Sequence, residues 1–158
     1  MLVDAMPSDA LMKLETLAVE AMEKLDFVPD TGLSIYIATD ENVQSLNQQY
    51  RGVDATTDVL TFPAEPMPEE FGDEEAPYAG DVILAYQHIL DQAAQSNHVP
   101  ADEFGLLVLH GLLHLAGYDH DSPERQKVMW EKQAELLAVL NIPIIVPDFI
   151  HAPDEGES

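Results

Sequence analysis

Apolar residues recur at helical spacing near the start of the chain and at alternating positions soon afterwards. Five of them lie three or four residues apart and form one stripe on a helix: Leu11, Leu14, Ala18, Met22 and Leu25. Ser8 precedes the stripe and is a residue type that caps helices, so the pattern predicts a helix over residues 8–25. Residues 33–38 alternate and are rich in β-branched and aromatic types, which predicts a strand.

The middle of the chain predicts one further helix and two further strands. We expect Asp40 to cap a helix that runs to about residue 50. Residues 58–62 and 81–86 are short apolar runs bounded by Pro63 and Gly80, as is typical of buried strands. The intervening residues 64–79 hold three prolines and six acidic residues with little periodicity, so we expect an exposed acidic loop.

The second half of the chain is predicted to be helical. Residues 87–97 favour one helix, and Pro100 precedes another that is almost continuously apolar over residues 104–116. A helix that is apolar all round is a buried central helix. Ser122 and Pro123 are typical of the start of a last helix over about residues 124–140. The alternation of elements predicts an α+β fold, with a small mixed or partly antiparallel sheet of three to four strands packed with about five helices.

Length and composition favour one domain. The chain has 158 residues, of which 46% are hydrophobic, enough for one core over residues 1–150, followed by an acidic, frayed tail at 151–158. No apolar run approaches the roughly 20 residues that cross a bilayer, and no secretory signal pattern opens the chain, so we expect a soluble cytoplasmic protein with no membrane partner. There is no cysteine, so a soft-metal site would have to be built from histidine with help from carboxylates.

The charge is strongly negative. Thirty acidic residues against six Lys and Arg give a formal net charge of -24, which argues against general coating of nucleic acid. Three of the six basic residues, Arg125, Lys127 and Lys132, follow the histidine-rich segment 110–120, and Arg51 closes an earlier helix. They either form a local positive patch or are solvated helix charges; the sequence leaves both open.

The segment 110–120 reads HGLLHLAGYDH and holds three of the six histidines. His110 and His114 are four residues apart, so on a helix both rings lie on one face. Gly117 can adopt a positive φ that ends the helix and turns the chain back, which would bring His120 to the same point. The spacing therefore predicts that His110, His114 and His120 bind one divalent metal.

Three imidazoles leave one tetrahedral position for water, which is typical of a catalytic zinc site. Zn²⁺ is favoured, although another divalent ion such as Ni²⁺ is compatible with these ligands. The same spacing occurs in zinc proteases, where a Glu follows the first histidine as general base. Here that position is Gly111, so a protease-like hydrolase is the second hypothesis.

The histidine segment resembles the H-G-x-L-H-L-x-G-Y-D-H signature of the YbeY family of bacterial endoribonucleases. The similarity continues in LNQQYRGVDATTDVLTFP at residues 46–63 and in GDVILAY at residues 80–86. In matching order it covers about residues 33–140. The chain departs from the family in having only three residues before Asp4, where a first strand is usual, and in lacking a common proline between Asp54 and Thr57.

The resemblance implies a metal-dependent, single-strand-specific endoribonuclease that acts in ribosomal RNA maturation, notably of the small-subunit 3′ end, and in ribosome quality control. By motif match, His110, His114 and His120 take the metal-ligand positions and Arg51 takes that of a functionally important arginine, which we expect to bind phosphate. Asp81 is a candidate for orienting a histidine or transferring a proton, and Asp119 for supporting a ligand. A non-catalytic, metal-stabilised module that binds the ribosome is the remaining alternative.

Overall fold

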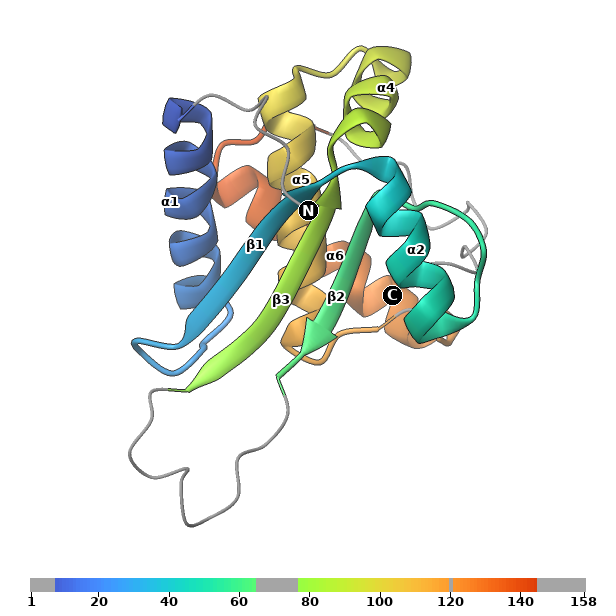
Figure 1. Ribbon diagram of the computed structural model, residues 1–158. Coiled ribbons are helices and arrows are strands. Elements are labelled where there is room, and N and C mark those ends of the chain that lie inside the picture. The colour runs from blue at the N-terminus through green and yellow to red at the C-terminus, as the bar shows by residue number, and fades with distance from the viewer. Residues whose placement is uncertain (1–7, 65–76, 120, 145–158) are drawn as a thin grey trace.

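The computed structural model describes residues 8–64, 77–119 and 121–144, and within them the chain forms five helices and three strands. Figure 1 shows their order, which is α1 (Ser8–Lys24), β1 (Gly32–Ala38), α2 (Asp40–Arg51), β2 (Val59–Pro63), β3 (Tyr78–Ala85), α4 (Tyr86–Ser96), α5 (Pro100–Leu115) and α6 (Pro123–Val139). Each element corresponds to one that the hydrophobic pattern predicts. The α+β class is confirmed.

The sheet is mixed and has the order β1-β3-β2, with β3 in the centre. β3 pairs in parallel with β1 and antiparallel with β2. Because successive side chains on a strand point to opposite faces, β3 serves two cores. Val82 and Leu84 join the main core with α5, whereas Ile83 and Ala85 join a smaller cluster with α2.

Helix α5 is the central element behind the sheet in Figure 1, where α1 and α6 lie beside it. Most of its residues are buried, because its sequence is apolar on every side. It lies very close to the strands at Gly111, where an added Cβ would meet Thr61 Cγ2 at 3.1 Å and Val82 Cγ1 at 3.2 Å. The glycine therefore lets α5 lie directly against β2 and β3. This close approach sets the distance of the neighbouring His110 from the sheet.

Helix α2 lies on the opposite face of the sheet, in front of the strands in Figure 1. Val43 and Leu46 pack there against Leu60 of β2 and Ile83 of β3. The predicted cap was wrong by one residue: Thr39 is the N-cap, and its hydroxyl accepts the backbone N–H of Asn42 at 3.1 Å. The Asp40 carboxylate instead accepts the backbone N–H of His88 at 3.1 Å, which joins α2 to α4.

Some of the predictions concern residues that the structure does not describe. β3 begins at Tyr78, so the predicted loop boundary at residue 79 was too late, and residues 65–76 lie outside the described part. The same holds for residues 1–7 and for residues 145–158, which include the predicted frayed tail at 151–158. None of the described helices combines the length and apolarity that crossing a membrane requires.

Candidate metal centre

His110 and His114 lie one turn apart near the C-terminal end of α5, on a common face as their spacing predicts. Their ring centroids are 4.9 Å apart and the rings stand at 75° to one another. Both residues are half-buried, and the Nε2 atom of His114 is withdrawn from solvent. The two imidazoles thus lie close together in a partly desolvated site. The lower dielectric constant there strengthens electrostatic interactions.

The chain turns sharply after α5. Gly117 has φ 104°, in the region that favours glycine, and its N–H donates to His114 O at 3.0 Å. The Tyr118 N–H donates to Leu113 O at 2.9 Å, and the Ser122 hydroxyl then caps α6 by accepting the Arg125 N–H at 3.2 Å. The predicted helix end at Gly117 and helix start at Ser122 are therefore confirmed.

His120 lies outside the described residues. Its approach to His110 and His114 stays a prediction. Among the residues that the structure describes, no group of three His, Cys, Asp or Glu side chains is placed to hold a metal. That statement does not cover a group of three ligands that includes His120, because residue 120 is not described.

Helix α6 supplies a hydrogen bond to the first histidine. Gln133 Oε1 lies 3.0 Å from His110 Nδ1. Because an amide oxygen can only accept, this contact is a hydrogen bond when Nδ1 carries the proton, which leaves the lone pair of a neutral ring on Nε2. Trp130, one turn before Gln133, stands edge-on to the His110 ring at a centroid distance of 6.2 Å. The ring is thus held by α6 as well as by its own helix.

Sequence reasoning missed Gln133, although a signal was present. The buried residues of α6 are Met129, Gln133, Leu136 and Leu137, so a single polar side chain interrupts an otherwise apolar stripe. A polar residue on a buried face needs a partner, because an unpaired amide in the core costs about 1–3 kcal/mol. The interruption thus indicates a specific contact across the helix pair.

These residues fit a divalent metal of the kind that imidazole binds. A histidine ligand typically donates its second ring N–H to an oxygen acceptor, and Gln133 supplies that oxygen for His110. The absence of cysteine in the chain leaves histidine as the soft ligand type. Among the common ions, zinc, nickel and copper suit such a donor set.

Arg51 ends α2 and reaches the edge strand of the sheet. Its Nη2 donates to the carbonyl oxygen of Thr61 at 3.3 Å, and the residue is exposed. The Thr61 side chain packs against Gly111, the neighbour of His110. The guanidinium is thus anchored to the same strand residue that α5 packs against. Its hydrogen-bond partner is a neutral carbonyl, which does not neutralise its charge.

Asp81 is not brought to the histidines. It pairs with Phe62 and alternates with Val82, so it lies on the face of the sheet that α5 does not cover. There it accepts a short hydrogen bond from the Tyr78 hydroxyl, which is also 2.6 Å from Ser34 Oγ. Partial burial and the bond to the Asp81 carboxylate raise the pKa of Tyr78 above its usual 10.0.

Asp119 follows the turn and lines a pocket of about 220 Å³ with Tyr118 and the start of α6. In the sequence it directly precedes His120, and its role in supporting a ligand stays a prediction. Two of the three basic residues of α6 have acidic neighbours: Arg125 lies 3.6 Å from Asp121, and Lys132 lies 3.4 Å from Glu135. These two contacts favour the solvated-charge interpretation over a local positive patch.

Known proteins resemble this chain over most of its length. Residues 4–141 match the family described as Endoribonuclease YbeY. Curated relatives with that name include one from Levilactobacillus brevis, 34% identical over 85% of this chain and 90% of the relative, and one from Chloroflexus aurantiacus, 38% identical over 84% and 87%. The solution structure of TM1509 from Thermotoga maritima has a TM-score of 0.60 and 31% identity, covering 88% of this chain and 86% of its own. The chain therefore belongs to the YbeY endoribonuclease family.

Proposed function

We propose that this protein is a metal-dependent endoribonuclease that cleaves single-stranded RNA. In this proposal His110, His114 and His120 bind one divalent ion, with zinc favoured. Its work is the maturation of ribosomal RNA in the cytoplasm, at the small-subunit 3′ end, together with ribosome quality control. The observation that carries the proposal is the pair of imidazoles on α5, with ring centroids 4.9 Å apart and Gln133 Oε1 at 3.0 Å from Nδ1 of His110.

A bound ion at this place would act as a Lewis acid toward a phosphate oxygen. The rest of the chemistry falls to the chain. Gln133 holds the His110 ring. Gly111 lets α5 pack closely on the sheet, which keeps both rings at a fixed distance from it. Positioning of this kind matters because a shift of about 1 Å in a reacting group can cost about 100-fold in rate.

Arg51 is the residue we propose to bind the scissile phosphate. A planar guanidinium can donate to two phosphate oxygens at once. The chain has only six Lys and Arg, and the contact of Arg51 with the Thr61 carbonyl does not neutralise its charge. In a protein of net charge -24, such a cation is a scarce attraction for a polyanion.

Asp119 is proposed to support a ligand histidine through its carboxylate. Asp81 has no part in the proposal, because its carboxylate serves the Tyr78 hydroxyl on the other sheet face. Thus one of the two candidate aspartates is retained.

The protease-like alternative loses ground at Gly111. A zinc protease would place its general base there. An added Cβ would already lie within 3.3 Å of Thr61 and Val82 side chains, so the position faces the sheet and has no room for a carboxylate. The residue next to the first histidine is used for packing.

The deciding experiment measures cleavage of a single-stranded RNA by the metal-loaded wild type and by His114→Ala. We expect cleavage by the wild type, its loss on chelation and a fall of at least about 100-fold in the variant. His88→Ala is the control, because His88 is also half-buried in a helix but lies on α4, away from this site. Metal binding without RNA cleavage would favour the non-catalytic module, and cleavage of casein alone would favour a protease.

A further inference from the structure

We propose that Gln133 is a positioning residue for the metal ligand His110: its amide oxygen fixes the tautomer and the angle of the ring, so that Nε2 is the coordinating atom. The inference rests on the proposed metal site and adds to it a residue on a different helix. It concerns the tautomer and orientation of the His110 ring in the metal-free protein.

The burial of Gln133 supports this role. The side chain is 2% exposed and lies among the apolar residues Met129, Leu136 and Leu137 of α6. An amide is a costly choice at such a position unless it makes a hydrogen bond. Its oxygen meets Nδ1 of His110 at 3.0 Å, across the contact between α5 and α6.

Another buried amide shows what a purely structural role looks like. Asn47 is fully buried in α2, and its Nδ2 donates to the backbone oxygen of Ala55 at 2.8 Å. That bond ties a loop to a helix and involves no titratable group. Gln133 instead bonds to a side chain that the family signature singles out, and it uses its oxygen, the atom that determines where the imidazole proton sits.

The consequence for His110 is chemical. A neutral imidazole has one N–H and one lone pair, and the bond made by one nitrogen decides the state of the other. With Nδ1–H donating to Gln133, the lone pair is on Nε2 in the metal-free protein as well. The edge contacts of the ring with His114 and Trp130 restrain its rotation further. Binding a metal then needs neither a proton shift nor a ring flip.

The substitution Gln133→Met tests the idea, because methionine has similar length, suits a buried apolar position and lacks the oxygen acceptor. We expect zinc affinity of the full chain, measured by competition with a chromogenic chelator, to fall about 10–100-fold. Gln133→Glu keeps an oxygen at the same reach and is expected to retain affinity within about threefold of wild type. Thermal unfolding of the metal-free proteins reports whether each variant still folds.

Nitrogen NMR of the imidazole rings provides a measurement that a structural role would not change. In the metal-free wild type we expect His110 to carry its proton on Nδ1, and in Gln133→Met to lose that preference. In a His110→Ala background, Gln133→Met should leave zinc affinity unchanged. Wild-type affinity in the single Gln133→Met variant, or an unchanged tautomer, would overturn the inference.

The outcomes separate this inference from the proposed function. If wild type binds zinc and His114→Ala does not, but Gln133→Met binds as wild type does, the metal site stands and the role of Gln133 is rejected. If wild type and His114→Ala bind zinc equally, the histidine site itself is wrong and the role of Gln133 falls with it.

Discussion

The two faces of the sheet place neighbouring residues of β3 in different environments. On the face covered by α5, Val82 packs against Gly111, and the histidines lie in a partly dry place between helices. On the face that α2 covers only in part, Asp81 and Tyr78 bond to one another with Tyr78 46% exposed. One step along β3 thus separates a site built by close packing from a polar cluster near water.

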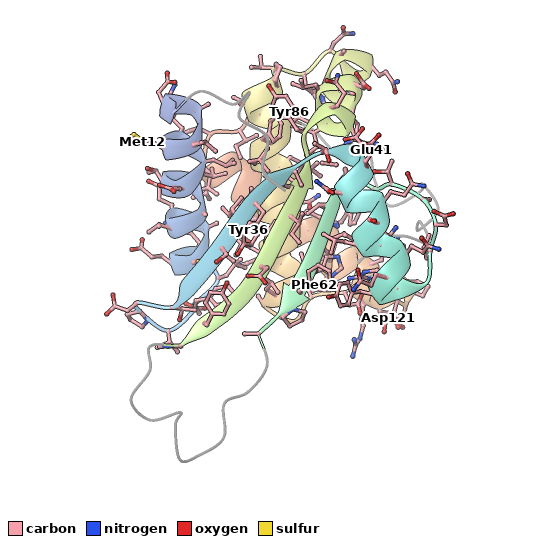
Figure 2. The ribbon with its side chains drawn as sticks, viewed as in Figure 1. Met12, Tyr36, Glu41, Phe62, Tyr86 and Asp121 are labelled. Carbon is pink, nitrogen blue, oxygen red and sulfur yellow. The ribbon has the colours of Figure 1, made fainter. Side chains whose placement is uncertain are left out.

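The open face has its own set of exposed aromatic residues. Tyr36 is 42% exposed on β1, and Figure 2 shows it on the sheet beside β3 and away from α2. Phe62, also labelled there, lies on β2 at the opposite edge of the same face, where its ring centroid is 5.5 Å from that of Tyr50 of α2. In the proposed function the chemistry belongs to the covered face, and the polar residues of β3 on the open face take no part in it.

The largest expected effect separates the two faces by activity. His110→Ala should reduce RNA cleavage by at least about 100-fold, because it removes a ligand, whereas Asp81→Asn should leave it within about twofold. Both rates are measured on one RNA at saturating metal. A comparable loss in Asp81→Asn would mean that the open face takes part in the chemistry.

Arg51→Gln should reduce cleavage by about 10–100-fold, mainly through weaker RNA binding, because glutamine can still reach a carbonyl but carries no charge. The exposed position predicts a stability change within about 0.5 kcal/mol. Rates over a salt series, with Arg125→Gln as a matched control, report the phosphate contact. If both variants respond equally, Arg51 is one surface charge among others.

The close packing on the covered face is tested by two alanine substitutions within α5. Gly111→Ala brings a Cβ against the β-branched Thr61 and Val82, while Gly105→Ala meets only the tips of Leu17 and Ile142 at 3.2 and 3.3 Å. The gain in helix propensity is the same for both. We therefore expect Gly111→Ala to be less stable than Gly105→Ala by about 1–2 kcal/mol in urea unfolding. Equal stabilities would show that the sheet yields to the extra methyl.

The smallest effect concerns the open face at alkaline pH. The raised pKa of Tyr78 means that the folded chain holds the phenolic proton more tightly than the unfolded chain. The resulting stability is complete below about pH 10 and is lost as the pH rises through the folded-state pKa. Tyr78→Phe should flatten this alkaline loss without changing RNA cleavage, as pH-dependent unfolding curves would show. An unchanged slope would mean that the hydroxyl contact contributes nothing.

Hydrophobic periodicity predicted the fold well because it depends on local spacing. The buried apolar run before His110, the four-residue step to His114 and the positive φ of Gly117 are all local properties, and the structure confirms each. The α2 cap was misplaced because Thr39 and Asp40 are both good capping types.

Contacts between elements were harder to predict. The face of Asp81 depends on the register of β3, which shifts against β1 between Gly32 and Ser34. The sequence pattern of one strand does not contain that register. Gln133 required knowledge that α6 packs its buried stripe on α5, although its place within an apolar stripe was a usable signal. Such contacts emerge only when two helices are placed together.

The most direct test of the account is X-ray absorption spectroscopy of the zinc-loaded full-length protein. Three imidazole nitrogens at about 2.0–2.1 Å from the metal are expected in the wild type and two in His120→Ala. A zinc shell without imidazole, or one that is the same in wild type, His114→Ala and His120→Ala, would contradict a metal centre on the covered face.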